Sequence, residues 1–391
     1  MAMVHRLARS ILAGAVLAVA VAAPAAAADD VKVVASGLDN PRGLNFGPGD
    51  FLYVAEAGKG GSGPCTSGPE GGDQICLGAS GAVTRVKADG DDQERIRSGL
   101  PSVASPQGTE AIGPADVSWP AEGIRSLGFL TMGLAAPPDV KNVFGAGGAL
   151  LATVQRIHPD GRTRTLADLG AYETANDPDK NLSEGELDTD PDGAYALNNR
   201  EVIVADSAGN DILSVTRTGE IKLLAVIPFG QASAPPGIPD LPAGTTIPVQ
   251  SVPTSVAVAE DGTIYVSELT GFPFVPGTSK IWKVPAGGGT PEEVFSGLTL
   301  VTDVELAEDG SLYVVQISND SLLADTPAPG KVIRIKPDGS REDVSGDLPG
   351  PYAVAVKGGY AYVTTHTTEP GAGQVVRIRL PEGAGGDGDD D

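Results

Sequence analysis

A short frame recurs along the chain, and it constrains the fold more than any single motif does. The frame opens at a proline or valine, crosses a turn rich in Gly and Asp, and reaches an aromatic or isoleucine residue twelve positions later. Copies at 114–132 and 351–362 are looser. The copies that keep this spacing are 41–56, 191–206, 253–268 and 301–316. An internal period of this kind indicates a repeat architecture in which each copy is one structural unit.

Each copy is followed by a second half-unit of short β-branched runs. In the first copy, residues 81–86 read GAVTRV, and the turn Asp89-Gly90 follows them. Such runs, bounded by Asp-Gly or Gly-Gly, predict hairpins because glycine adopts positive φ without a Cβ clash. Each unit is therefore expected to hold four antiparallel strands, named A to D here. The prediction is an all-β, six-bladed β-propeller with four-stranded blades.

The two ends of the repeat array predict how the ring closes. The last unit stops at its strand C, residues 375–380, and no strand D follows. Residues 31–38 end in Ser-Gly-Leu, the phrase that also ends strand D at 98–100 and 296–298. We therefore expect the N-terminal strand to complete the last blade. An all-β solenoid or sandwich is the alternative. Units stacked in a line would not need the first strand of the chain to replace the missing strand D of the last unit.

The segments outside the repeats predict an exported protein. Residues 1–28 have a basic start, an apolar run at 11–23 and small residues before Asp29, which is the pattern of a secretory signal peptide. An uncleaved membrane anchor is the alternative, and the short apolar run argues against it. We expect a propeller over 29–381 and an acidic, disordered tail over 382–391. The predicted product is a secreted, extracellular monomer without a stable membrane span.

Charge and cysteine content narrow the partners. The formal net charge is −24, which argues against nucleic acid because phosphate binding needs clustered Lys and Arg. The chain has two cysteines, Cys65 and Cys76, both in the Gly-rich stretch after strand B of the first unit. An even count in an exported chain predicts a disulfide. A metal pair is the alternative, and no His or further Cys lies nearby to complete one.

Long connections are confined to one face of the predicted ring. The B–C and D–A connections at 57–80, 133–150, 171–189 and 228–251 are long, whereas most A–B and C–D turns are tight. In an up-and-down blade, B–C and D–A connections emerge on the same side, which we call the insertion face. Loops held on a rigid scaffold are common binding sites, so we expect this face to bind a ligand. Neutral variation in exposed loops is the alternative.

Polar residues at fixed frame positions are expected to open onto the insertion face near the axis. They are, at the ends of strands B, Glu56, Asp206, Glu268, Gln316 and Thr365, with Gly133 in the loosest copy, and, near the starts of strands A, Arg42, Asp116, Asp192, Ser255 and Asp303. Carboxylates close to an axis repel one another and need a cation, a basic partner or water. Oxygen ligands suit Ca²⁺ or another hard divalent cation, with Glu56, Asp206 and Glu268 as the candidate ligands. A hydrated channel mouth is the alternative.

Machinery for nucleophilic catalysis is sparse in the sequence. His366, after strand B of the last unit, is the candidate base or metal ligand near the axis. Residues 188–193 imitate the start of an EF-hand loop, but Asn199 stands at position twelve and no helices are expected around them. Asp177-x-Asp179-x-Asn181 lies just upstream and lacks the turn glycine. No G-x-S-x-G elbow, P-loop, dinucleotide fingerprint or H-E-x-x-H occurs.

The phrases PRGL…YVAE…GAVTRV-x-x-DG and VIVADSAGNDILSV resemble exported propellers of the ScyD/ScyE family. The resemblance covers most of residues 31–380, and NHL-repeat, gluconolactonase-like and streptogramin lyase-like propellers share related strand signatures. It implies an uncharacterised or non-catalytic extracellular propeller. The long loops of the insertion face and the lack of catalytic motifs lead us to expect a binding or scaffold protein for a small molecule, glycan or protein. The alternative that the resemblance implies is a metal-dependent hydrolase or lyase in which a divalent cation polarises a carbonyl.

Overall fold

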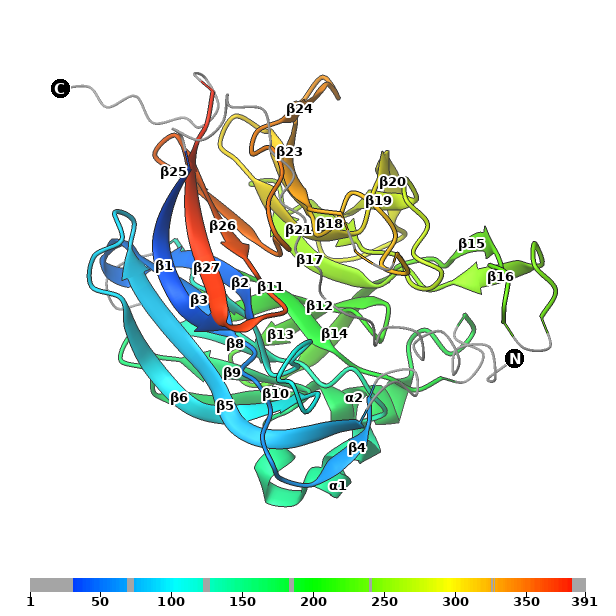
Figure 1. The fold of residues 1–391 in the computed structure, drawn as a ribbon, viewed down its shortest axis with the longest axis horizontal. Helices are drawn as coiled ribbons and strands as arrows, with labels where there is room; N and C mark the ends of the chain where they lie inside the picture. Colours follow the sequence, from blue (N-terminus) through cyan, green and yellow to red (C-terminus); the bar gives the residue numbers. More distant parts are fainter. Residues whose placement is uncertain are drawn as a thin grey trace.

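The computed structural model describes residues 31–68, 74–121, 127–182, 186–238, 241–324, 326 and 328–381. The predicted signal peptide (1–28) and acidic tail (382–391) lie outside the described residues. Within these ranges six antiparallel sheets form the blades, each with strands A to D in order from the axis outward, and a seventh, two-stranded sheet is a separate hairpin (Figure 1). The predicted six-bladed propeller with four-stranded blades is therefore confirmed.

The blades follow the repeat frame. Blade 1 consists of β2 (Pro41–Gly47), β3 (Phe51–Glu56), β5 (Gln74–Lys87) and β6 (Glu94–Ala104). Blade 2 consists of β7 (Pro114–Ser118), β8 (Gly128–Met132), β9 (Thr153–Ile157) and β10 (Thr163–Asp168). Blade 3 consists of β11 (Pro191–Asn198), β12 (Glu201–Asp206), β13 (Asp211–Thr216) and β14 (Ile221–Val226). Blade 4 consists of β17 (Pro253–Val258), β18 (Ile264–Glu268), β19 (Ser279–Val284) and β20 (Glu292–Leu298). Blade 5 consists of β21 (Val301–Leu306), β22 (Leu312–Gln316), β23 (Lys331–Ile335) and β24 (Arg341–Asp343). Blade 6 consists of β25 (Val354–Lys357), β26 (Tyr360–Thr365), β27 (Pro370–Arg379) and β1 (Val31–Asp39).

The first and last strands of the ring close it. β1 pairs antiparallel with β27, with Val31 opposite Ile378, and the two lie side by side as blue and red arrows in Figure 1. β25 in turn contacts β2 of the first blade, so the innermost strands meet all the way round. The Ser-Gly-Leu phrase explains the ending of β1, because Gly37 has a φ of 71° and Leu38 after it is fully buried. Closure by the N-terminal strand agrees with the expectation.

Apolar side chains fill the spaces between blades. Along β3, Leu52 and Val54 pack against the last blade, whereas Tyr53 and Ala55 pack against the second. Successive side chains of a strand point to opposite faces, so each inner strand supplies two neighbouring interfaces. This arrangement explains why the strands B read as continuous apolar runs instead of alternating with polar residues.

The innermost strands are also joined by threonine hydroxyls. Thr131 accepts a hydrogen bond from the N–H of Asp116 (2.9 Å) and donates one to the carbonyl of Asp192 in the next blade (2.5 Å). Thr364 does the same between Ala353 and Arg42, at 3.0 Å each. Bulges interrupt the ladder at the starts of β2, β7, β11, β17 and β21, and at β7 the Thr131 hydroxyl pairs the N–H of Asp116. The bulges also turn polar side chains toward the axis.

The insertions form small elements on one face. They are η4 (Pro138–Val140), α1 (Lys141–Phe144), η5 (Gly145–Gly148), α2 (Leu169–Asn176), β4 (Cys65–Ser67) and the hairpin of β15 (Gly230–Ser233) and β16 (Thr246–Val249), while η2 (Pro48–Asp50) forms an A–B turn. Cys65 and Cys76 form the predicted disulfide. Both cysteines were expected in a loop. Instead, Cys65 lies on β4, which extends the first sheet, and stands opposite Cys76 on β5. A disulfide is typical of an oxidising compartment.

Among the described residues, no helix has both the length and the apolar character needed to cross a bilayer.

Replacing Leu38 by Ala tests closure by β1. We expect the variant to lose about 2–5 kcal/mol of unfolding free energy, because a fully buried leucine leaves a cavity between β1 and β27. Val33→Ala on the same strand is the matched control, since Val33 is 48% exposed, and it should change by less than about 1 kcal/mol. Urea unfolding measures both. Equal losses in the two variants would contradict a closing role for β1.

Candidate functional site

The starts of three innermost strands converge at the axis on the insertion face. The Tyr352 hydroxyl donates a hydrogen bond to Oδ2 of Asp192 (2.6 Å), and the Arg42 guanidinium lies 4.7 Å from the centre of the Tyr352 ring. Arg42 also donates to the carbonyl of Ala111 (3.0 Å). One cation, one phenol and one carboxylate thus meet where three blades come together.

Asp190 adds a second carboxylate to this group. Its Oδ1 accepts a hydrogen bond from the N–H of Leu134 (2.8 Å), and a Cβ at Gly133 would lie only 2.5 Å from that oxygen. Gly133 therefore has a definite role, because it lets Asp190 approach the axis. Asp190, Asp192, Arg42 and Tyr352 line a cavity of about 70 Å³. That space suits an ion or a few water molecules and is too small for a drug-sized substrate.

Two further carboxylates lie deeper in the channel and bond to neighbouring blades. Oδ2 of Asp116 accepts the N–H of Ala194 (2.8 Å), and Oδ2 of Asp303 accepts the N–H of Val354 (2.7 Å). Ser255 also hydrogen-bonds to Asp303. These carboxylates therefore hold innermost strands together as well as charging the channel. Glu305 follows on β21 and lines a 590 Å³ hollow at the opposite mouth.

The axial carboxyl groups hold their protons to higher pH than exposed carboxyl groups do. Burial raises the pKa of Asp116, Asp190 and Asp192, and neighbouring carboxylates raise each further, while Arg42 opposes the rise at Asp190 and Asp192. Burial, with Asp303 and Asp116 nearby, raises the pKa of Glu305 to about 8. At neutral pH the channel therefore retains protons or attracts a cation.

The acids and amide at the ends of strands B serve their own blades. Three of them, Glu268 excepted, accept a backbone N–H from the segment that leads into the same blade. The pairs are Glu56 with Asp39 (2.8 Å), Asp206 with Asp190 (2.6 Å) and Gln316 with Thr299 (3.0 Å). Glu56 also pairs with Arg95, with Nη2 and Oε2 2.5 Å apart. Thr365 is buried in β26, and its hydroxyl has no hydrogen-bond partner.

The structure therefore brings together the strand A residues and separates the strand B residues. Glu56, Asp206 and Glu268 are not among the carboxylates whose oxygens approach within 4.8 Å in the described part of the chain. Their joint role as metal ligands stays a prediction. His366 follows β26 with a φ of 52°, and its Nδ1 lies 3.5 Å from Glu369, outside the residues that line the axial cavity.

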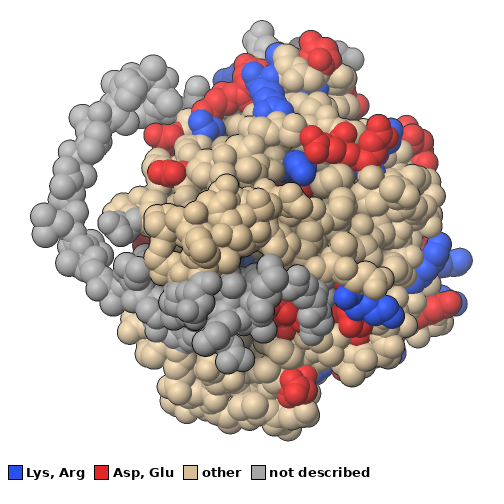
Figure 2. Space-filling view, turned by 90° about the vertical axis from the view of Figure 1, so that its right-hand side faces the viewer, with Lys and Arg blue, Asp and Glu red and all other residues tan. Residues whose placement is uncertain are grey.

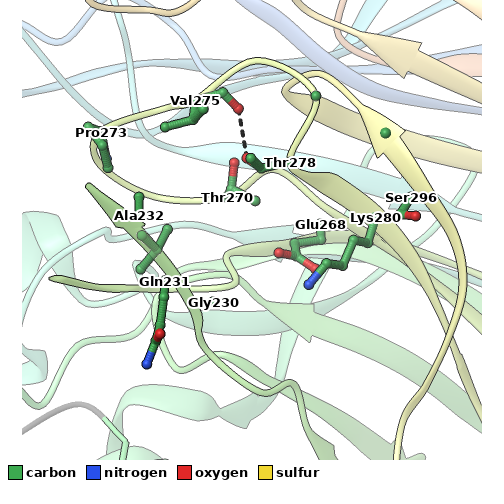
Figure 3. A pocket seen from close by; sticks show the side chains of 13 residues that line it. Gly230, Gln231, Ala232, Glu268, Thr270, Pro273, Val275, Thr278, Lys280 and Ser296 are labelled. Atoms are coloured by element: carbon green, nitrogen blue, oxygen red, sulfur yellow. Dashed lines mark hydrogen bonds between the residues drawn. The ribbon is translucent and has the colours of Figure 1, made fainter. Parts of the chain in front are cut away.

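Glu268 lies instead on a larger pocket away from the axis. This pocket, of about 470 Å³, is enclosed by three segments of the insertion face: β15, the loop after β18, and the end of β20. Figure 3 shows Glu268 and Lys280 beside one another at one end, with Thr270 and Thr278 above them. The pocket is of the size that binds small molecules.

Glu268 is held firmly at the pocket floor. The indole N–H of Trp282 donates to its Oε2. Burial raises the pKa of Glu268 to about 7, although the bond to Trp282 and the charge of Lys280 oppose the rise. Glu268 can therefore act as a charged acceptor or a neutral donor near physiological pH.

Three residues of the axial group were absent from the sequence prediction. Tyr352 occupies the frame position of Arg42 and Asp192, one residue after the opening proline, so the frame itself marked it. Glu305 lies two residues after Asp303 and therefore shares its face of β21. Asp190 had no such signal, because the equivalent position is not acidic in the other copies.

Comparison with known proteins supports the fold alone. No protein-family model matches the chain, and no curated protein matches it significantly. Solved β-propellers do resemble it. They include a protein of unknown function from Bacteroides thetaiotaomicron (10% identity, 90% of this chain and 75% of that one, TM-score 0.55), the PQQ-bound aldose sugar dehydrogenase of Streptomyces coelicolor (13%, 92% and 99%, 0.51) and virginiamycin B lyase of Staphylococcus aureus (12%, 90% and 99%, 0.46).

The raised pKa of Glu305 predicts how the unfolding free energy of the protein depends on pH when EDTA keeps the channel free of metal ions. A carboxyl whose folded pKa exceeds its unfolded pKa loses stabilisation as the pH rises between the two values. For Glu305 this window runs from about 4.5 to about 8. The unfolding free energy should therefore fall from pH 5 to pH 8, and Glu305→Gln should reduce that fall by on the order of 3 kcal/mol.

Urea unfolding at each pH, with EDTA present, measures this effect. Glu220→Gln, at an exposed turn residue before β14, is the control and should follow the parent protein. A Glu305→Gln variant with the parent's pH dependence would show that the channel does not disfavour the ionised carboxylate.

Proposed function

We propose that the protein is an extracellular binding propeller that holds a small, hydroxyl-rich ligand in the pocket beside Glu268. The observation that carries the proposal is the 470 Å³ pocket built by insertions of the insertion face, with Glu268 and Lys280 on its floor. The disulfide and the predicted export signal support a site of action outside the cytoplasm.

The lining of the pocket favours a polyol such as a saccharide. Glu268 and Lys280 offer a charged acceptor and a charged donor, and Thr270, Thr278 and Ser296 add hydroxyls. Pro273, Val275 and Val249 supply an apolar side, against which the C–H face of a sugar ring packs well. The side of the molecule that carries β15 and β16 is mostly uncharged across its middle (Figure 2), which favours a neutral ligand over a highly charged one.

Glu268→Gln is the direct test, because glutamine keeps an acceptor for Trp282 while removing the charge. Monosaccharides and disaccharides are titrated against the protein by calorimetry and by tryptophan emission. Trp282 touches Glu268 and reports binding, whereas Trp119, between the first two blades, serves as constant background. We expect a hit in the panel whose affinity falls about tenfold or more in the variant, since a charged hydrogen bond is worth about 1.5–3 kcal/mol.

Glu293→Gln is the matched control. Glu293 contacts the same Lys280 (3.6 Å) but does not line the pocket, so its loss should change affinity less than about twofold. The affinity should also decrease as the pH falls through about 7, where Glu268 gains a proton. Absence of any binding in the sugar panel, or equal effects of the two variants, would refute a saccharide site here.

A second candidate function is hydrolase or lyase chemistry at the axis. It is favoured by the contact of Tyr352 with Asp192 beside Arg42, where raised pKa values of Asp190 and Asp192 suit proton transfer near neutral pH. A divalent cation held by Asp190 and Asp192 would, when bound, polarise a carbonyl oxygen. Asp192 would take a proton from the attacking water and return it to the leaving oxygen, while the Tyr352 hydroxyl orients that carboxylate by its hydrogen bond.

Lactone and ester hydrolysis with added Ca²⁺, Mg²⁺, Mn²⁺ or Zn²⁺ tests this second candidate. Asp192→Asn retains an acceptor for Tyr352 but cannot take up a proton, so turnover should fall about a hundredfold or more with an unchanged Tm. Full activity in Asp192→Asn, or none in the parent protein with any of the four cations, would exclude this function.

A further inference from the structure

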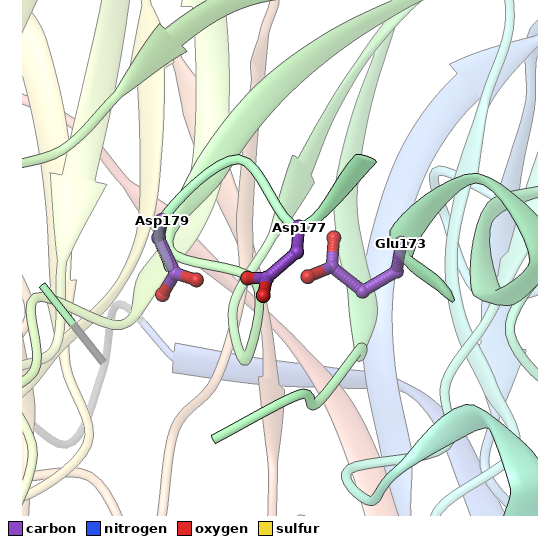
Figure 4. A group of neighbouring side chains, drawn as sticks. All are labelled: Glu173, Asp177 and Asp179. Atoms are coloured by element: carbon purple, nitrogen blue, oxygen red, sulfur yellow. The ribbon is translucent and has the colours of Figure 1, made fainter. Parts of the chain in front are cut away.

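A second group of carboxylates lies away from the axis, where blade 2 leads into blade 3. Glu173 is on α2, Asp177 caps the C-terminus of that helix with a φ of 43°, and Asp179 follows in the next turn. One oxygen from each lies within 4.8 Å of the others, and Figure 4 shows the three side chains in a row, facing the same space.

A fourth carboxylate, Asp211 of blade 3, interacts electrostatically with this group. It is the first residue of β13, its side chain is fully buried, and neither carboxylate oxygen has a hydrogen-bond partner. Glu173 and Asp179 are among the charges that act on it. Glu173, 2% exposed, likewise has an unpartnered Oε1, and Asp177 has an unpartnered Oδ1. A buried, unpaired carboxylate is costly, and the described part of the chain supplies no hydrogen-bond partner for these oxygens, so they are available to a ligand.

Three of the four carboxylates have no positive partner among the described residues. In the described ranges, no lysine or arginine forms an ion pair with Glu173, Asp177 or Asp211. Asp179 does have a polar partner, because its Oδ2 accepts a hydrogen bond from Nδ2 of Asn210 (2.9 Å). Burial and neighbouring carboxylates raise the pKa of Glu173 to about 8, as expected where negative charges share a dry space.

We propose that Glu173, Asp177, Asp179 and Asp211 form a calcium site. The donors are all oxygens, which hard divalent cations prefer. Calcium binds oxygens at 2.3–2.6 Å, so two ligands on opposite sides of the ion lie about 5 Å apart, close to the observed limit of 4.8 Å. Three ligands from one short irregular segment and one from a strand suit flexible calcium coordination better than the strict octahedron of magnesium.

The position of the site indicates what the cation does. It joins the insertion between β10 and β11 to the turn before β13, two segments far apart in sequence. That insertion continues into Asp190 at the axial cavity, and Asp206 of the same blade accepts the N–H of Asp190. Bound calcium would therefore fix the rim of the channel as well as stabilise blade 3.

Calcium titration of the EDTA-treated mature protein tests the site by calorimetry and thermal unfolding. We expect one calcium per chain at this site and a raised Tm in the parent protein. Asp211→Asn and Glu173→Gln should both lose this binding and the Tm increase. Asp211→Asn should also be more stable than the parent in EDTA, because it removes a buried unpaired charge. A merely structural carboxylate would not produce that pair of effects.

Glu220→Gln, at an exposed turn residue before β14, is the control and should retain the calcium response. Loss of binding in Asp192→Asn with full binding in Asp211→Asn would overturn the proposal and place the ion in the channel. Absence of any calcium effect on the parent would overturn it as well. Asp177→Asn, where asparagine tolerates the left-handed backbone, provides a gentler variant, and terbium emission excited through Tyr172 provides a second measurement.

Discussion

Six innermost strands must meet around one axis, and the remaining features of the structure depend on that constraint. Their bulged starts leave backbone groups outside the β-ladders, and a polar side chain pairs each group where the structure shows the contact. Thr131 and Thr364 link their own strand A to the strand A of the next blade. Asp116 and Asp303 accept N–H groups across the same boundaries. The polar residues at the axis therefore hold neighbouring blades together, whether or not they also bind a ligand.

This origin of the axial polarity explains why acidic residues alone are a poor guide to function in this fold. Glu56, Asp206 and Gln316 each fasten the segment that enters their own blade, so their oxygens are already occupied. Asp211 and Glu173 differ, because they are equally buried but have oxygens that accept no hydrogen bond from the described residues. Unpaired oxygen atoms, more than the number of carboxylates, distinguish a ligand site from a structural network.

The repeat frame predicted most of the architecture because its spacing reports strand length and turn chemistry directly. It identified the six blades and, through the Ser-Gly-Leu phrase before Asp39, the closing strand. It could not predict side-chain direction at the blade ends. A bulge shifts the alternation by one residue, so Asp192 and Asp116 both reach the channel from different frame positions. The sequence marked Asp177 and Asp179 as a run of acids, but it gave no sign of Glu173 and Asp211, because the group joins an insertion to a strand of the next sheet.

Pairing of the first strand with the last one has a consequence for biogenesis. Val31 leaves the ribosome long before its partner Ile378, and at 5–20 residues per second the interval is on the order of 20–70 s. During that time β1 is an unpaired edge with exposed N–H and C=O groups, which other chains can capture. Correct folding of this protein therefore depends on keeping β1 from pairing with other chains until β27 has been synthesised.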